Sequence, residues 1–268
     1  MVVNLLSLAQ DLKYMENNKI CLINQPAGLG DILLCQKIAS HYTKMGYDVV
    51  WPVVKFYDYI SEYIKNDGVT FYIEDEDFPH KQEFLENQIQ ITQTDNFVYL
   101  PLQHADKIRI DSKTFLYAKY DFCELEPDNW LEYFELVRNK EREQKLIEHF
   151  EIDINEPYNV VNKTFATPPN TITNSSIVPK NDYKTINMEI LGWDRIFDWM
   201  GVLENAKEIH TVDTSLTLIL AKQELENVHI YERTNAYANY SEPNPNYVHK
   251  DLFCNRWNYY TSKTRNGF

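Results

Sequence analysis

The short stretch PAGLGD, residues 26–31, sets two glycines beside an acidic residue. Glycine adopts positive φ angles and lets the backbone approach a ligand closely, so Gly28, Leu29 and Gly30 could form a loop that turns Asp31 toward a bound molecule. A carboxylate in that position could act as a general base toward a hydroxyl group. It could equally cap the following helix by accepting backbone N–H bonds. The sequence leaves both interpretations open.

A second stretch, Asp213–Ser215, sets a carboxylate and two hydroxyls where an apolar strand gives way to a helix. Hydroxyls and free N–H groups at a helix N-terminus bind phosphate well. Thr214, Ser215 and the amide of Leu216 are therefore candidate phosphate ligands. An ordinary Asp/Thr/Ser helix cap is the competing interpretation. His210, within the preceding strand, is expected to be a core histidine.

The first stretch lies inside a strand–loop–helix–strand pattern. Residues 19–24 (KICLIN) predict a strand, the apolar spacing from Leu34 to Met45 predicts a helix, and residues 47–54 (YDVVWPVV) predict a second strand. This order is a βαβ unit, which implies a parallel sheet with a right-handed crossover. PAGLGD does not match the G-x-G-x-x-G pattern, and no acidic residue closes the second strand, so a nicotinamide site has little support.

The same alternation continues along the chain. Further strands are expected at 69–73, 97–102, 158–165, 183–190, 207–212 and 227–233, with a long helix at 129–150 and shorter helices at 195–206 and 214–222. The segment at 167–176 reads as a polar loop. We therefore predict an α/β protein of two Rossmann-like domains facing each other across a cleft, with domains at 1–156 and 157–268.

The formal net charge of −14 argues against a nucleic-acid partner, since such binding rests on many Lys and Arg contacts to phosphate. The charge is uneven: residues 1–156 hold 15 basic and 28 acidic side chains, whereas residues 157–268 hold 11 and 12. The second half is therefore the better host for a small anion. Acidic surface that only confers solubility is the alternative.

The four cysteines form no C-x-x-C pair, and the seven histidines form no H-E-x-x-H motif. We expect buried thiols in a reducing compartment and no built-in metal site. No apolar run is long enough for a membrane span, and the N-terminus does not resemble a signal peptide. These features favour a cytoplasmic location.

Two motifs carry a family resemblance. PAGLGDILLCQKIASHY resembles the N-terminal G-x-G-D motif of GT-B glycosyltransferases of the heptosyltransferase type, in glycosyltransferase family 9. AKEIHTVDTSLTLILAK resembles their C-terminal D-T/S-G-x-x-H-x-A motif. The motifs cover about 40 residues directly, and their order and the βα pattern between them agree with the family.

The resemblance implies a GT-B-like fold and the transfer of a sugar from a nucleotide-sugar donor to an acceptor hydroxyl, with no metal and no further cofactor. By resemblance Asp31 is the base in an acceptor-side domain. Thr214, Ser215 and the amide of Leu216 hold the donor phosphates, with Asp213 beside them as a loop residue of the cleft. Lys163, or failing that Lys180, supplies a positive charge. Arg233 and Glu189 are further candidates, the latter for a hydrogen bond to ribose or base.

The second motif departs from the family at two positions, with Ser215 in place of glycine and Leu218 in place of histidine. A non-catalytic protein that binds a nucleotide or glycan on the same fold is therefore a competing function. A different α/β enzyme, such as a nucleotide-using transferase or hydrolase, is a third.

Overall fold

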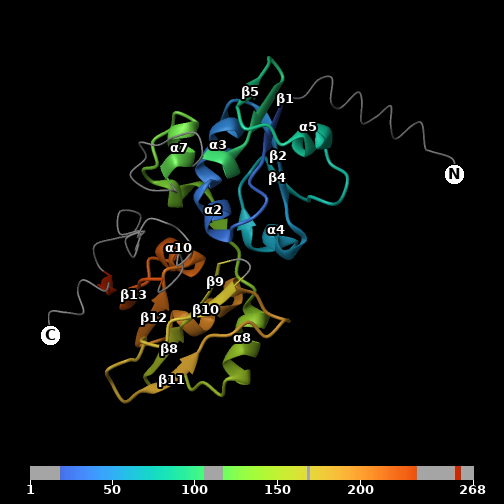
Figure 1. Cartoon of the computed structure of the whole chain (residues 1–268). Coiled ribbons are helices and arrows are strands. Elements are labelled where there is room, and N and C mark those ends of the chain that lie inside the picture. Colours follow the sequence, from blue (N-terminus) through green and yellow to red (C-terminus); the bar gives the residue numbers. More distant parts are fainter. Residues whose placement is uncertain (1–18, 106–116, 168–169, 234–256, 261–268) are drawn as a thin grey trace. The chain divides into compact units, whose positions relative to one another are not determined.

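The computed structural model describes residues 19–105, 117–167, 170–233 and 257–260. The chain divides into two compact units, Met1–Val137 and Arg138–Phe268. Each unit is built around its own sheet of mostly parallel strands (Figure 1). Among the described residues, no helix combines the length and the apolar character that crossing a membrane requires.

The first unit has one main sheet, flanked by helices and short 3-10 turns (η). Its elements are β1 (Lys19–Ile23), α2 (Leu29–Leu34), α3 (Gln36–Lys44), β2 (Tyr47–Val53), η1 (Lys55–Tyr57), α4 (Ile60–Tyr63), β3 (Ile64–Lys65), β4 (Val69–Ile73), α5 (Lys81–Glu86), β5 (Thr92–Gln93), β6 (Phe97–Leu100), η2 (Leu102–His104), α7 (Tyr117–Phe122), η3 (Trp130–Tyr133) and β7 (Glu135–Leu136).

The strand order of this sheet is β4-β2-β1-β6-β5, with β5 antiparallel and the other four strands parallel. Numbered along the chain, the parallel strands run 3-2-1-4, which matches the first four strands of the Rossmann order 3-2-1-4-5-6. The order reverses between β1 and β6. Ligands of open α/β sheets bind beyond the carboxyl ends of the strands at such a reversal.

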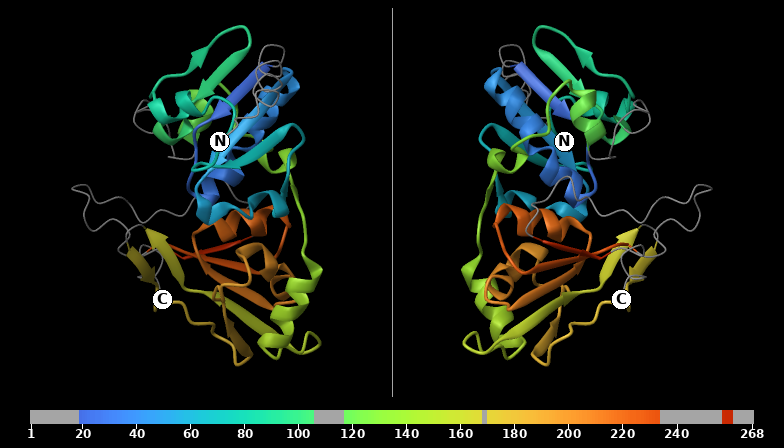
Figure 2. Two further views of the ribbon diagram at one scale, coloured as in Figure 1. Left: turned by 90° about the vertical axis from the view of Figure 1, so that its right-hand side faces the viewer. Right: turned by 90° about the vertical axis from the view of Figure 1, so that its left-hand side faces the viewer.

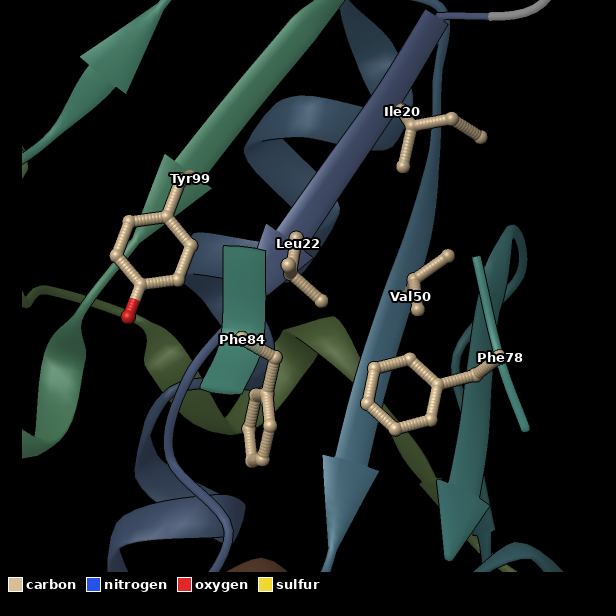
Figure 3. Packing of buried hydrophobic residues seen from close by; sticks show 6 residues of the cluster. All are labelled: Ile20, Leu22, Val50, Phe78, Phe84 and Tyr99. Atoms are coloured by element: carbon tan, nitrogen blue, oxygen red, sulfur yellow. The ribbon is translucent and has the colours of Figure 1, made fainter. Parts of the chain in front are cut away.

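Alternating side chains of β1 fill the two faces of this sheet. Ile20 and Leu22 join one buried cluster, whose other members are Val50, Phe78, Phe84 and Tyr99 (Figure 3). Cys21 and Ile23 point to the opposite face and are also buried. Strands buried on both faces read as continuous apolar runs, which is why this strand could be predicted from its sequence.

The second unit is organised in the same way. Its elements are α8 (Lys140–His149), β8 (Tyr158–Asn162), β9 (Thr164–Thr167), β10 (Asn170–Thr173), β11 (Lys184–Asn187), η4 (Ile196–Trp199), α9 (Met200–Leu203), β12 (Glu208–Val212), α10 (Ser215–Lys222), β13 (Val228–Tyr231) and β14 (Asn258–Tyr260). The sheet order is β11-β8-β12-β13-β14, all parallel, so the order reverses between β8 and β12.

Two predicted elements differ from the structure. The predicted helix at 129–150 is interrupted because Phe134 is extended, and β7 then pairs with β3; only residues 140–149 form α8. The predicted polar loop at 167–176 contains β10, which pairs antiparallel with β9. Polar strands of this kind lack the apolar alternation that identifies a half-buried strand.

The division between the units also precedes the predicted boundary after residue 156. Helix α8, the yellow-green helix of Figure 2, packs against α9 and η4 of the second unit. Its buried Glu143 accepts hydrogen bonds from Arg138, whose guanidinium also bonds Glu204 just after α9. The helix therefore belongs with the second sheet, and the assignment of acceptor and donor roles to the two halves stays a prediction.

Candidate active site

Asp31 lies in the first turn of α2, beyond the carboxyl end of β1 and next to the reversal in strand order. The N-cap of the helix is Gly28, so the alternative that Asp31 is the N-cap is wrong. One carboxylate oxygen, Oδ1, is buried and accepts no hydrogen bond from the described residues, while the side chain as a whole is 20% exposed. Oδ1 is therefore not the atom through which this side chain meets solvent.

Gly28 makes room for that carboxylate. Its φ angle is +85°, and a Cβ atom built there would lie 2.3 Å from Oδ2 of Asp31. The prediction that a glycine turns this loop is confirmed at Gly28. Gly30 plays a different part from the one expected: it is the second residue of α2, and Gly28 alone of the two takes a positive φ.

Lys119, on α7, is the cation beside Asp31. Its Nζ lies 3.5 Å from Asp31 Oδ1 and donates hydrogen bonds to Gln25 Oε1 (2.7 Å) and to the carbonyl oxygen of Leu102 (2.9 Å). Gln25 follows β1 and Leu102 follows β6, so Lys119 bridges the two loops on either side of the strand-order reversal. The lysine itself is only 2% exposed. A buried lysine needs such partners because desolvating an unpaired charge is costly.

Tyr57 contacts the backbone at the start of α2. The backbone N–H of Leu29 donates to its hydroxyl at 3.3 Å. Burial raises the pKa of Tyr57, and the nearby charge of Asp31 raises it further, against the amides of Leu29 and Gly28 that lower it. Tyr57 therefore stays a neutral hydroxyl around pH 7.

The second candidate region lies at the start of α10, next to the reversal between β8 and β12. Thr214 is the N-cap, and its Oγ1 accepts the amide N–H of Leu216 at 3.3 Å. Ser215, the first helical residue, is half-buried, and Leu216 is fully buried. The capping interpretation is thus confirmed for Thr214. The phosphate-binding role of Thr214, Ser215 and the Leu216 amide stays a prediction.

Asp213 and Arg233 lie together at this end of the sheet. Asp213 is buried, and its carboxylate accepts a hydrogen bond from Thr217 Oγ1 at 3.2 Å, within α10. Arg233, just beyond β13, donates from Nε to the carbonyl oxygen of Asp213 at 2.5 Å. Its guanidinium also lies over the ring of Phe165 on β9, 5.7 Å from the centroid. A planar cation fixed in this way suits an anionic ligand.

The remaining predicted residues lie at different ends of the strands of the second sheet. Lys163 directly follows β8, at the same reversal as α10, and is half-buried. Glu189 follows β11 and is exposed. Lys180 lies near the amino ends of the strands, because its neighbour Asn181 accepts a hydrogen bond from Asn159 near the start of β8. The topology therefore favours Lys163 over Lys180 beside Arg233.

Sequence reasoning missed two charged residues at these positions. Lys119 stands among aromatic residues in LYAKYDF, a context that signals a buried lysine. Glu232 is buried beside Arg233, and its Oε2 has no hydrogen-bond partner in the described structure. Nothing in the sequence around Glu232 distinguishes it from a surface carboxylate at the end of a strand.

A cluster of potential metal ligands lies elsewhere in the second unit, on β12 and β13. Ligand atoms of Glu208, His210 and His229 are within 4.8 Å of one another. However, the two imidazole rings stack with centroids 4.4 Å apart and planes 13° apart, so their lone pairs run side by side instead of converging. His210 also bonds Glu208 (2.9 Å) and Tyr231 (3.0 Å) through its two nitrogens.

We interpret this cluster as a hydrogen-bonded stack. Burial lowers the pKa of both histidines, and the Glu208 partner partly offsets this for His210. His210 is 3% exposed, as expected for a core histidine. Cys21, Cys35 and Cys123 are free thiols, and the first two are buried as predicted; Cys254 lies outside the described residues.

No family model and no curated protein matches the chain. Among solved structures, a glycosyl transferase family 9 protein from Veillonella parvula matches with a TM-score of 0.53 and 10% identity, over 92% of this chain and 87% of that chain. The iron-containing dodecameric glycosyltransferase TibC from enterotoxigenic E. coli matches with a TM-score of 0.46 and 8% identity, over 80% of this chain and 58% of that chain. The first match confirms the resemblance at the level of the fold: the chain has the fold of a glycosyltransferase family 9 protein.

Proposed function

We propose that this protein is a glycosyltransferase that moves a sugar from a nucleotide-sugar donor to the hydroxyl group of a saccharide or other acceptor. The family 9 fold supports this class of reaction. The single observation that carries the proposal is the placement of Asp31. Its carboxylate lies at the strand-order reversal of the first sheet, with Oδ1 buried toward Lys119 and Oδ2 accommodated by Gly28.

In the proposed reaction the acceptor oxygen attacks the anomeric carbon of the donor sugar. Asp31 takes the proton from the acceptor hydroxyl as the new C–O bond forms. The bond between the anomeric carbon and the diphosphate breaks, and its electron pair leaves with the nucleoside diphosphate. A carboxylate suits this task because the hydroxyl becomes acidic only late in the displacement.

The leaving diphosphate needs positive charge and N–H donors where its negative charge develops. The start of α10 offers Thr214 and Ser215, with Arg233 held against Asp213 close by. Lys163 follows the neighbouring strand β8. We propose that these groups bind the diphosphate without a metal ion, and that the two units face each other across a cleft.

A thermal-shift screen with nucleoside mono- and diphosphates and UDP-, GDP- and ADP-linked hexoses, with and without EDTA, tests the donor site. A ligand present at a hundredfold excess over its dissociation constant stabilises the native state by about 2.7 kcal/mol. We expect one nucleoside diphosphate to raise the melting temperature and EDTA to leave that shift unchanged. A shift that EDTA removes would contradict metal independence.

Replacing Asp31 tests the base. We expect Asp31→Asn to lower the rate of sugar transfer by about 10²–10⁴-fold, the range typical of a general base, while the nucleoside diphosphate still binds. Asp128→Asn is the matched control, since Asp128 is an exposed carboxylate of the same unit that pairs with Lys37. Loss of nucleotide binding in Asp31→Asn would instead make Asp31 part of the donor site.

A non-catalytic nucleotide- or glycan-binding protein is the second candidate, and two observations favour it. The Leu216 amide is already bonded to Thr214. Leu218, which stands where the family motif has histidine, is 4% exposed and belongs to the core, so its side chain is not available to a ligand. Nucleotide binding without turnover for any donor in the panel would select this candidate.

A further inference from the structure

Lys119 is a lysine whose side chain is buried in the first unit. It stands on α7 beside Tyr120, which is also fully buried and donates its hydroxyl to the carbonyl oxygen of Leu34 at 2.5 Å. Leu34 ends α2, the helix that begins with Asp31 in its first turn. Two consecutive residues of α7 therefore contact α2, one near its start and one at its end.

The contacts of Lys119 fix where its charge lies. Hydrogen bonds to Gln25 and Leu102 hold Nζ between the loops that follow β1 and β6. Gln25 is itself held, because its Nε2 donates to the carbonyl oxygen of Ala27 at 2.5 Å. The ammonium group therefore has little freedom to follow Asp31 if the carboxylate moves. It is a fixed charge toward which the carboxylate orients.

We propose that Lys119 is a positioning residue for Asp31, an inference that rests on the proposed transferase function. The ion pair at 3.5 Å holds Oδ1 on the buried side of the carboxylate. Oδ2 is thereby directed over Gly28 as the oxygen that takes the proton from the acceptor. Lys119 itself touches neither substrate, and it acts only through the orientation of Asp31.

The two oxygens of Asp31 thus have separate tasks. An aspartate in the first turn of a helix samples several rotamers, and most of them would turn its oxygens away from a single line of attack. A misplacement of about 1 Å in a reacting group costs on the order of 10²-fold in rate. Removing the lysine should therefore lower kcat through disorder of the base while the donor site in the second unit is unchanged.

The test compares Lys119→Met and Lys119→Arg with a matched control, Lys37→Met. Lys37 is also a lysine of the first unit with one carboxylate and one carbonyl partner, both in Asp128, and it does not contact Asp31. With the donor found by the thermal-shift screen, we expect Lys119→Met to lower kcat by about 10–100-fold and to change the donor KM by less than about twofold. Lys119→Arg, which keeps the charge, should retain more of the rate, and Lys37→Met all of it.

The decisive measurement is made in the Asp31→Asn background. If Lys119 acts through Asp31, Lys119→Met lowers the residual rate of Asp31→Asn no further. An equal further loss in that background, or a Lys119→Met rate within about twofold of wild type, would overturn the inference. An inactive wild-type protein would instead contradict the proposed transferase function.

A readout besides activity keeps the two failures apart. Urea midpoints of Asp31→Asn, Lys119→Gln and the double variant measure the pair in the absence of any substrate. We expect the double variant to lose less than the sum of the two single losses, because each single change leaves one charge without its partner. Additive losses would show that the two residues are not coupled, and would overturn the inference even if the wild type has no turnover.

Discussion

The carboxylate of Asp31 occupies the space in which a side chain at Gly28 would lie. A Cβ atom at Gly28 would be 2.3 Å from Asp31 Oδ2 and 3.3 Å from its Cγ. A side chain at residue 28 would therefore displace the carboxylate of Asp31.

Replacing Gly28 separates the strain of the backbone from the displacement of the carboxylate. Gly28→Ala should cost roughly 1–2 kcal/mol of unfolding free energy for the positive φ alone, and should also displace Asp31. Gly46→Ala is the control, because Gly46 has the same φ of +85° with nothing within 4 Å of its added Cβ. Urea denaturation should show a larger loss for Gly28→Ala, and only that variant should lose transfer activity. Equal losses in both variants would show that Asp31 moves aside without cost.

The cap of α10 makes a second comparison possible. Thr214→Val should cost about 1 kcal/mol of unfolding free energy, because the Leu216 N–H loses its acceptor. If the hydroxyl also contacts a diphosphate, affinity for the nucleoside diphosphate should fall roughly tenfold or more. Binding can be measured by calorimetry.

Asn139→Ala provides the control for this change. Asn139 caps α8 by accepting the Arg142 N–H at 3.1 Å, so its loss should cost a similar free energy. It follows no strand of either five-stranded sheet, and nucleotide affinity should not change. A Thr214→Val variant that loses stability but keeps its affinity would restrict Thr214 to capping.

The sequence predicted the parts of this fold whose signals are local. Strand β1 is an unbroken apolar run, and α10 begins at a Thr with a capping hydroxyl, so both were recognisable. Phe134 was misread because its burial comes from an extended segment that pairs with a distant strand, and no helical or strand period distinguishes the two over so few residues.

The candidate site was predictable on one side only. Asp31 could be identified from its neighbouring glycines, because a turn with a positive φ favours glycine, as at Gly28. Its partner Lys119 comes from a segment 88 positions along the chain, and only the packing of α7 against α2 brings them together. The aromatic neighbours of Lys119 indicate a buried lysine but not its partner, so the pairing with Asp31 had to come from the structure.

The buried ion pair between Glu143 of α8 and Arg138 predicts a large effect on stability. Glu143 has a side chain only 4% exposed, and it is held by Arg138 and, at 3.2 Å, by Lys140. Arg138→Met leaves a buried carboxylate with only the lysine, and should cost about 3 kcal/mol, the lower end for a broken buried ion pair. Urea denaturation measures this loss. The double variant Arg138→Met/Glu143→Met should recover part of it, and a double variant as unstable as the single one would show that packing, not charge, is what Arg138 supplies.

The stacked histidines of the second sheet predict a loss of stability in acid. Burial lowers the folded-state pKa of His210 and His229, so the unfolded chain binds protons more readily. Their contribution to stability is complete above the unfolded pKa of about 6.5 and is lost as the pH falls below it. We expect the urea concentration at the unfolding midpoint to decrease as the pH is lowered from 7.5 to 5.5.

Carboxylates also begin to titrate in that range, so the test is a difference between variants. His229→Phe keeps a ring in the stack between His210 and Tyr260 but removes one titrating group. Its urea midpoint should fall by less than that of the wild type over the same pH interval, because fewer protons are taken up on unfolding. His41→Gln, at an exposed position of α3, should behave as the wild type does. An unchanged fall in His229→Phe would assign the acid sensitivity to groups outside the stack.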